Sequence, residues 1–368
     1  MRAGGGGPGR LWAARAGTAE RAVRTRHLRS LWWMPTARLG VVRWPATARE
    51  RMFVRPWHYW WQAHLLDCLL DAQLRAPQPS RRDLADRLAR GIRVRNLSAW
   101  TNDYYDDVAW LGLALQRSGQ AVGLHRDGAV DAITTRLRSG WTGHGGGGIW
   151  WRVGDDFKNV PANGPAAILL ARTGNPADFD RALRIGQWMT DNLVDPDRGL
   201  LWDGLRVDTG GAVRSVDQAV YSYCQGVYLG TCLELAAGTG DVEWLYRAAR
   251  TVEATAEHLT DDDGVLRCHG DGDGGLFTGI LVRYLALAAT GLPAGEEVTR
   301  SLAAGLVVTS AEAAWRHRSI AVGGPLFGTE WSVPCASPPA ASRDLSVQLS
   351  GWMLCEAAAL IERRAAEA

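Results

Sequence analysis

The chain contains a single lysine, Lys158, although lysine and arginine together account for 41 of its 368 residues. Such a bias toward arginine is typical of a GC-rich coding sequence, so it says little about partners. The formal net charge is only +2, which gives no indication of a nucleic-acid partner. Apolar residues make up 46% and charged residues 22%, the balance of an ordinary soluble globular protein.

The chain has little cysteine and no cysteine pattern. Its six cysteines are scattered, without a C-x-x-C pair or a histidine at zinc-site spacing. They read as small buried hydrophobic residues in a reducing compartment, and we expect no metal site. The six are Cys68, Cys224, Cys232, Cys268, Cys335 and Cys355.

Long apolar runs are also missing. No apolar segment follows the early arginines as it would in a signal peptide, and we find no run of about 18 apolar residues that could span a bilayer. We therefore expect a cytoplasmic protein without a transmembrane segment. The first 55 residues hold 12 arginines and two acids, Glu20 and Glu50. Apolar spacing over residues 18–32 predicts a basic amphipathic helix. We assign residues 1–40 to a basic N-terminal segment that supplies the first helix, and residues 41–368 to a single domain.

Tryptophan, in contrast, is abundant, with 18 residues against 5 phenylalanines. Phenylalanine would fill a core without an indole N–H that needs a partner. The excess of tryptophan favours a carbohydrate-binding cleft, because flat indoles stack on the C–H faces of sugars. Tryptophan packed between helices is the alternative interpretation.

The apolar pattern predicts an all-α fold, because no long segment alternates apolar and polar residues. Two segments, 104–118 and 216–238, are apolar nearly all round and should be buried inner helices. Segments 81–95, 177–194 and 241–259 have one apolar stripe and should be outer helices. Twelve helices are expected at 15–31, 58–75, 81–95, 104–118, 128–139, 162–173, 177–194, 216–238, 241–259, 275–290, 295–316 and 343–366.

The joints between these helices repeat. Inner helices end at Thr-Gly, as in "ARTGNPADF" (171–179) and "AAGTGDVEWL" (236–245), and the next helix has an aspartate near its start. Gly-rich segments with short apolar runs, such as "GGGGIWWR" (145–152), "DRGLLWDG" (197–204) and "DDGVLRCHG" (262–270), return the chain at the opposite joints. Six hairpins of this kind predict an (α/α)6 toroid; a helical solenoid is the competing architecture.

Two adjacent aspartates, Asp106 and Asp107, begin one of the inner helices in "NDYYDDVAWLGLAL" (102–115). A helix cap and a first-turn acid would explain them structurally. However, two carboxylates about 5 Å apart repel by about 3 kcal/mol at an effective dielectric near 20, which separates their titrations by about two pK units. Such a pair provides the nucleophile and the general acid of a glycosidase, and close spacing favours the retaining geometry.

The same segment resembles the catalytic segment of glycoside hydrolase family 76, the endo-α-1,6-mannanases. The likeness continues through "HYWWQAHLLDCLLDA" (58–72), "GGGGIWWR", "DFKNVPANGPAAILLARTG" (156–174), "YSYCQGVYLG" (221–230) and "GDGDGGLFTGILVRYL" (270–285). The resemblance implies an (α/α)6 scaffold, a retaining mechanism with Asp106 as nucleophile, and Asp107 as general acid and base. It implies α-1,6-mannan or mannooligosaccharides as substrate, and transglycosylation is an open possibility because fungal members are thought to use glycan acceptors.

Further residues are candidates for contact with sugar. Asp273 is expected in a rim loop facing the cleft, and His64 and Gln225 need a partner inside otherwise apolar helices. For most of these residues a scaffold role is the alternative interpretation: the two asparagines after Lys158 could cap a helix, and Gln225 could bond a neighbouring helix. The full set is Asn102, Tyr104, Tyr105, Trp150, Trp151, Lys158, Asn159, Asn163, Tyr223, Gln225, Asp273 and His64.

Other functions stay open from the residues alone. A sugar epimerase or an inverting hydrolase could use the same toroid, and a non-catalytic toroid could bind glycan. An epimerase would use histidine bases, and the eight histidines form no obvious pair. No cofactor is expected, and the sequence does not indicate an oligomeric state.

Overall fold

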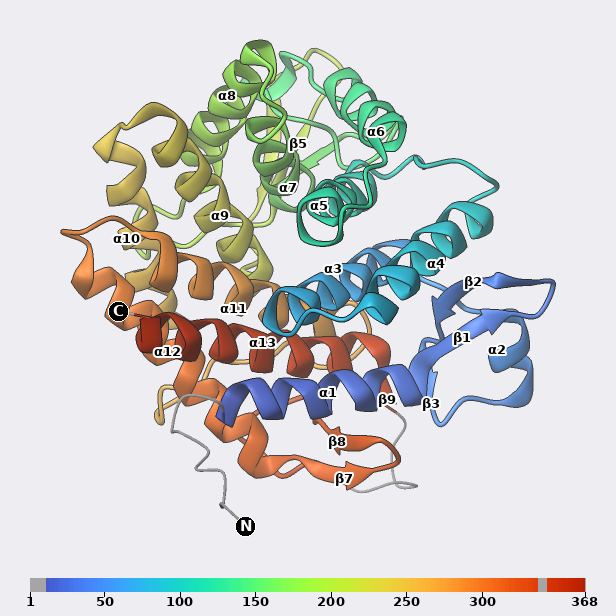
Figure 1. The fold of residues 1–368 in the computed structure, drawn as a ribbon. Coiled ribbons are helices and arrows are strands. Elements are labelled where there is room, and N and C mark those ends of the chain that lie inside the picture. Colours follow the sequence, from blue (N-terminus) through green and yellow to red (C-terminus); the bar gives the residue numbers. More distant parts are fainter. Residues whose placement is uncertain (1–10, 337–342, 368) are drawn as a thin grey trace.

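The computed structural model describes residues 11–336 and 343–367 and consists mainly of helices (Figure 1). Six helices form an inner ring in which each contacts the next, and the last contacts the first. The fold is therefore the predicted (α/α)6 toroid and not an open solenoid. The inner helices are α3 (Tyr59–Arg75), α5 (Tyr105–Val122), α7 (Val160–Ala171), α9 (Ser222–Thr239), α11 (Gly274–Gly291) and α13 (Leu345–Glu367).

Six outer helices surround this ring, and each packs on one inner helix or on two neighbouring ones. The first of them, α1, lies beside α13, so the first and last helices meet where the ring closes (Figure 1). The outer helices are α1 (Leu11–His27), α4 (Pro79–Arg95), α6 (Asp127–Ser139), α8 (Pro176–Leu193), α10 (Val242–His258) and α12 (Glu297–His317). Residues 1–10 of the predicted N-terminal segment lie outside the described residues.

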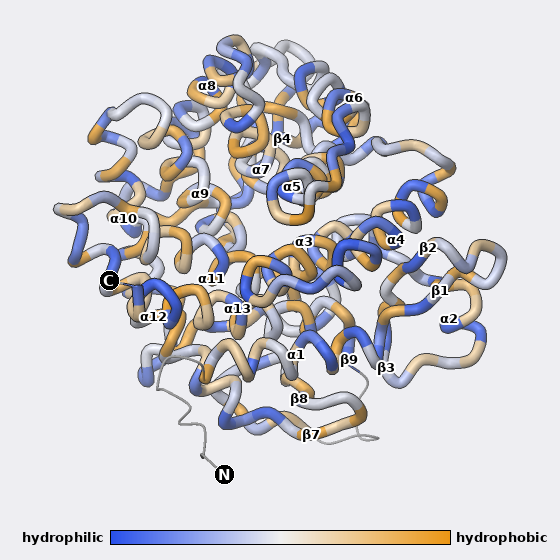
Figure 2. Tube along the Cα trace, viewed as in Figure 1, coloured by the Kyte–Doolittle hydropathy of each residue, from blue (hydrophilic) through white to orange (hydrophobic). Residues whose placement is uncertain are grey.

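Burial explains which helices are inner. Most residues of α5, α7 and α11 are buried, whereas α8 and α10 bury one face only, as their sequence patterns predict. Figure 2 shows hydrophobic residues concentrated on the helices of the inner ring. α11 is also apolar and long enough to cross a membrane by length and composition, which corrects the expectation that no such run exists; 67% of it is buried inside the protein.

Short strands connect the helices, more of them than the sequence pattern predicts. The predicted helix 15–31 ends at His27, because residues 28–40 form the antiparallel hairpin of β1 (Leu28–Leu31) and β2 (Met34–Gly40). The predicted helix 216–238 begins only at Ser222, since β6 (Val213–Asp217) pairs with β5 (Gly204–Val207), which pairs in turn with β4 (Phe157–Asn159). The remaining elements are α2 (Ala48–Phe53), β3 (Arg43–Trp44), β7 (Ser319–Ala321), β8 (Gly324–Leu326) and β9 (Arg343–Asp344).

The two ends of the ring differ. The first turns of α3, α5 and α11 meet at one end, where Trp60 and Trp61 contact Asp273 close to the aspartate pair. The last turns of the inner helices meet at the other end around a cavity of about 650 Å³ lined by the ion-paired residues Asp71, Arg117 and Arg283. Neither Asp106 nor Asp107 lines this cavity.

Candidate active site

Asp106 and Asp107 occupy the first turn of α5, and both side chains are partly accessible. The helix begins here because Asn102 organises the preceding turn: its Oδ1 accepts the backbone N–H of Tyr104, and its Nδ2 donates to Asp107 Oδ2 at 2.7 Å. Asp106 accepts two hydrogen bonds, from the indole Nε1–H of Trp151 at 3.1 Å and from the backbone N–H of Asp107 at 2.9 Å. The helix dipole adds a further preference for negative charge.

Both carboxyl groups hold their protons more tightly than usual. Burial raises the pKa of Asp106 to about 6, although the hydrogen bonds from Asp107 and Trp151 oppose the rise. The pKa of Asp107 is raised well above its ordinary value, first by burial and then by the neighbouring charge of Asp106. The two titrations are therefore separated, with Asp106 the more acidic group.

Two more carboxylates face the pair. Asp273, at the start of α11, accepts the indole N–H groups of Trp60 and Trp61 on its Oδ1 at 3.2 and 2.8 Å, and its charge raises the pKa values of both catalytic candidates. Burial raises the pKa of Asp203 to about 7, with repulsion from Asp217 and Asp106 adding to it. Asp273 and the ionised fraction of Asp203 thus add negative charge beside the pair, which suits a reaction that develops positive charge on the substrate.

Partly exposed aromatic rings lie near the pair. The ring of Tyr104 stands edge-on to Trp151 at 5.3 Å. Tyr223 stacks on Phe277 with the ring planes 3° apart and the centroids at 3.9 Å. Burial raises the pKa of Tyr223, and the charge of Asp106 adds to this rise. Partly exposed aromatic faces next to paired carboxylates are what a sugar-binding cleft requires. Asn102, Tyr104, Trp151, Tyr223 and Asp273 are therefore brought together with the pair.

Lys158 does not face the cleft, which corrects its prediction as a sugar contact. Its side chain is fully buried, and the ammonium donates to the carbonyl oxygens of Thr142, His144, Gly147 and Gly148 and to the Thr142 hydroxyl. Burial lowers its pKa to about 7. Lys158 thus holds the Gly-rich rim loop together from inside. The ammonium lies 4.3 Å from the centre of the Trp150 ring. That ring stays partly exposed, so the sugar contact of Trp150 remains a prediction.

Three buried amides are likewise structural and not sugar contacts. Gln225 accepts the N–H of Leu201 and donates to its carbonyl, and Asn163 does the same with Ile149. Asn159 caps α7 by accepting the N–H of Ala162. The polar atoms of these side chains bond backbone groups, because a buried peptide group needs partners as much as a sugar does.

Two further candidates lie beneath the cleft. Tyr105 is buried in the contact between α5 and α6, where its ring packs on Gly140. His64 is buried between Trp60 and Trp110 and lines the cavity at the far end of the ring. Burial keeps its pKa well below the ordinary value, so it is neutral. Both predictions of a sugar contact are corrected on these grounds.

The sequence reasoning missed several residues that the structure brings to the cleft. Asp203 follows Trp202 in the rim segment "DRGLLWDG". An acid in a segment expected at the rim is a sequence signal for a candidate site residue. The sequence predicts Trp60 and Trp61 only as part of a helix over residues 58–75. Tyr221 and Phe277 join Tyr223 in one aromatic cluster. Among the described residues, no group of three or more His, Cys, Asp or Glu side chains is placed to hold a metal ion.

Residues 40–353 match the family model for glycosyl hydrolase family 76. The chain belongs to this family. The α-1,6-mannanase GH76A from Salegentibacter sp. HEL1_6 is 31% identical and superposes with a TM-score of 0.84, covering 95% of this chain and 99% of that one. An inactive variant of that mannanase, with two consecutive aspartates replaced by alanine, has been solved with α-1,6-mannotetrose. This family 76 chain is thus a glycoside hydrolase similar to α-1,6-mannanases.

Two other relatives extend the comparison. A Listeria innocua protein is 27% identical with a TM-score of 0.82, covering 96% of this chain and 98% of that one. Mannan endo-1,6-α-mannosidase DFG5 of Candida albicans is 31% identical over 145 residues, which are 35% of this chain. The matched part spans about a third (32%) of that curated relative's length.

Proposed function

We propose that this family 76 chain hydrolyses α-1,6-mannosidic linkages with retention of configuration, through a covalent mannosyl ester on Asp106. One observation carries the proposal: two consecutive carboxyl groups share one cleft, yet their surroundings separate their pKa values. The chain has other consecutive aspartates, at 155–156 and 261–263, but these lie in surface loops outside the cleft. The inactive Salegentibacter variant, changed at two consecutive aspartates and solved with an α-1,6-linked mannooligosaccharide, supports both the site and the substrate class.

The hydrogen bonds assign the two roles. Asp106 is the nucleophile, because two N–H donors stabilise its ionised form. Asp107 is the acid, since the charge of Asp106 helps to keep it protonated. Asp106 attacks the anomeric carbon from the face opposite the leaving oxygen, and Asp107 donates its proton to that oxygen. Asp107 then removes a proton from water, which attacks the same carbon and releases Asp106.

The second step also accepts a sugar hydroxyl in place of water. The same ester on Asp106 would then be transferred to a glycan, with Asp107 removing the hydroxyl proton. The aromatic pair of Tyr223 and Phe277 beside the cleft offers a surface on which an acceptor ring could stack. Products longer than the starting oligosaccharide would identify this transfer.

The direct test is incubation with linear α-1,6-mannooligosaccharides. We expect Asp106→Asn and Asp107→Asn each to lower kcat by at least about 10²-fold. The matched control is Asp262→Asn/Asp263→Asn, a consecutive pair exposed in a loop, which should keep the wild-type rate. Full activity in either cleft variant would reject the assignment.

Azide separates the two roles. In Asp107→Ala, azide should attack the covalent intermediate and give an α-mannosyl azide. In Asp106→Ala, azide should displace the leaving group directly and give the β-anomer. The reverse pattern would exchange the roles of the two aspartates.

A further inference from the structure

An exposed aromatic cluster lies at the edge of the molecule, outside the cleft. Trp32 and Trp33 form the turn of the β1–β2 hairpin, and α2 carries Met52 and Phe53 beside them. The Trp32 ring lies edge-on to Trp33 at 5.9 Å and to Phe53 at 6.4 Å. The exposed fractions of Trp32, Trp33, Met52 and Phe53 are 61%, 43%, 52% and 38%. We call these four residues the aromatic tip.

Trp32 and Trp33 are not residues that a two-residue hairpin turn favours. Leu31 pairs with Met34, so Trp32 and Trp33 alone connect the strands. Two-residue hairpin turns usually carry glycine, asparagine or aspartate, whereas this turn carries two tryptophans, neither of them at a positive φ. Two large apolar side chains at a solvent-exposed turn break this local preference without gaining burial. Such conflicts concentrate where function requires them, and contiguous exposed apolar surface indicates a partner.

Arginines surround the aromatic tip. Residues 28–55 contain six arginines and one acid, Glu50, whose carboxylate is already engaged in capping α2. Arg49, Arg51 and Arg55 are exposed, and none of them forms an ion pair with an acid in the part of the chain that the structure describes. The pKa of Arg29 is lowered by burial and by repulsion from Arg51, as expected for crowded like charges. These three exposed arginines, on α2 and just after it, thus lie close in the chain to the aromatic tip, and we call them the cationic collar.

We propose that the aromatic tip and its arginines dock the enzyme on an anionic lipid bilayer. Tryptophan favours the interface between water and hydrocarbon, and each arginine near an anionic surface strengthens binding about fivefold. The charge decides between occupants: mannan is neutral and would not use a collar of unpaired arginines. A second copy of this chain would bring two cationic collars together, and their like charges would repel.

The tip stands at the same end of the ring as the cleft. Gln62, in the second turn of α3, bonds both backbone groups of Gly40 at the base of the hairpin, and α2 directly precedes the first turn of α3, which carries Trp60 and Trp61 (Figure 1). Docking through the tip would therefore bring the cleft end toward the membrane surface, where a membrane-attached glycan could enter. This last step rests on the proposed function, whereas the docking itself does not.

The test is co-sedimentation with vesicles, because 18 tryptophans would mask a fluorescence signal from two of them. We expect the protein to bind phosphatidylcholine vesicles that contain phosphatidylglycerol, to lose binding in high salt, and to bind pure phosphatidylcholine at least about tenfold more weakly. Trp32→Ala/Trp33→Ala and Arg49→Gln/Arg51→Gln/Arg55→Gln should each weaken binding by at least about tenfold. If the double tryptophan variant does not fold, Phe53→Ser provides the same test.

Two controls are matched to these variants. Tyr246→Ala removes another aromatic side chain with an exposed fraction of 61%, on outer helix α10, and should bind like wild type. Asp106→Asn/Asp107→Asn should also bind like wild type, so an inactive enzyme that still binds vesicles separates the docking from the proposed catalysis. The tip variants should hydrolyse soluble oligosaccharides at the normal rate.

Three results would overturn the proposal. The first is equal binding to anionic and neutral vesicles, or none to either. The second is capture of the wild type, but not of the tip variants, by insoluble α-1,6-mannan without vesicle binding. The third is a dimer in sedimentation velocity that Trp32→Ala/Trp33→Ala abolishes while vesicle binding is absent.

Discussion

Asp106 and Asp107 are identical side chains on neighbouring residues, and it is their surroundings that give them different chemistry. The indole N–H of Trp151 reaches only Asp106, and the amide of Asn102 reaches only Asp107. Asp203 and Asp273 add negative charge around them. A negative cleft holds the second proton on the pair at a pH where isolated aspartates would both be ionised.

The pH dependence of kcat/KM follows from these pKa values. The proposed mechanism needs Asp106 ionised and Asp107 protonated, so we expect a bell-shaped profile whose acidic limb has a pKa of about 6 and whose alkaline limb lies higher. Asp107→Asn should remove the alkaline limb from the residual activity. Initial rates on a mannooligosaccharide across the pH range provide the measurement, and an acidic limb near pH 4 would contradict the raised pKa of Asp106.

The raised pKa of Asp106 should also reduce stability at neutral pH. Its native pKa is about 6, above the ordinary value of 3.8, so the native state binds more protons than the unfolded state between these values. Stability is therefore lost as the pH rises through that window. Asp106→Asn should raise Tm by roughly 1–4 °C at pH 8 and leave it nearly unchanged near pH 4. A lower Tm for Asp106→Asn than for the wild type at pH 8 would show that the ionised Asp106 carboxylate stabilises the folded state.

At the scale of elements, buried amides repeat the same contact at several joints. The side chain of an inner-helix residue bonds both the N–H and the carbonyl of one residue in a connecting segment: Gln62 with Gly40, Asn163 with Ile149, Gln225 with Leu201, and Gln348 with Phe327. Each pair imitates one rung of a sheet. The contact satisfies a buried peptide group and fixes the segment on its helix.

Replacing one of these buried amides by an apolar side chain of similar size should lower the free energy of unfolding. Gln225→Leu leaves the N–H and the carbonyl of Leu201 without their side-chain partner, and we expect a loss of about 1–3 kcal/mol in the free energy of unfolding. Gln187→Leu, at an exposed position of α8, is the control and should change stability little. Urea denaturation measures both variants; equal effects would mean that the buried contact adds nothing.

The sequence predicts the long helices well and their joints less well. Helices such as α5 and α10 are recognisable because their apolar residues run all round or along one stripe. Residues 28–31 continue the pattern of α1, but the chain turns there because the buried His27 bonds its Nδ1 to the Val41 carbonyl, a contact made across 14 residues. Gln225 and Asn163 could not be separated from sugar-binding amides, since a sugar and a peptide offer the same hydrogen-bonding groups. Asp106 and Asp107 are candidates from the sequence because two adjacent charges begin an apolar inner helix and their segment resembles the catalytic segment of family 76.

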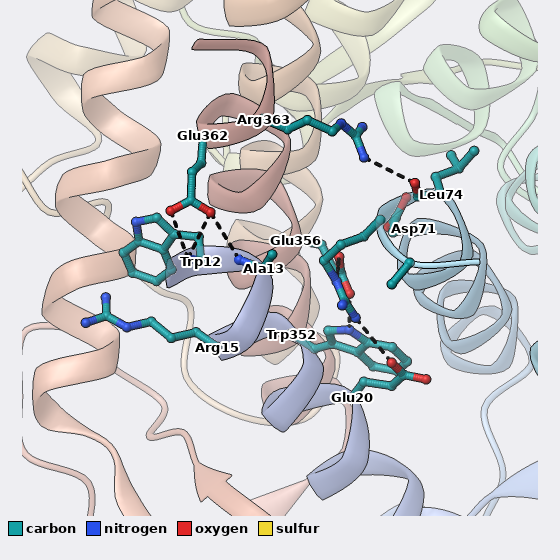
Figure 3. A network of polar contacts seen from close by, with 12 residues as sticks. Trp12, Ala13, Arg15, Glu20, Asp71, Leu74, Trp352, Glu356, Glu362 and Arg363 are labelled. Carbon is teal, nitrogen blue, oxygen red and sulfur yellow. Dashed lines mark hydrogen bonds and ion pairs between the residues drawn. The ribbon is translucent and has the colours of Figure 1, made fainter. Parts of the chain in front are cut away.

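At the scale of the whole molecule, contacts among α1, α3 and α13 close the ring. Figure 3 shows the contacts at this closure, where the Glu362 carboxylate on α13 accepts the backbone N–H groups of Trp12 and Ala13 at the start of α1. Arg75 on α3 bonds both Glu20 of α1 and Glu356 of α13. The first and last helices are thereby joined to the first inner helix.

Loss of the contact from Glu362 should therefore destabilise the whole fold. Glu362→Ala removes a carboxylate from a helix N-terminus, which should cost about 0.5–2 kcal/mol. Glu312→Ala, exposed on α12, is the matched control. Thermal or urea unfolding measures the difference, and a single transition shifted as a unit is expected for a closed ring. A separate early transition would show that α1 unfolds independently of the ring.

The central claim is that the pair works by double displacement, and the anomer of the first product tests it most directly. Proton NMR during early hydrolysis of an α-1,6-mannooligosaccharide should show the α-anomer of the newly formed reducing end before mutarotation. First formation of the β-anomer would contradict the covalent intermediate on Asp106.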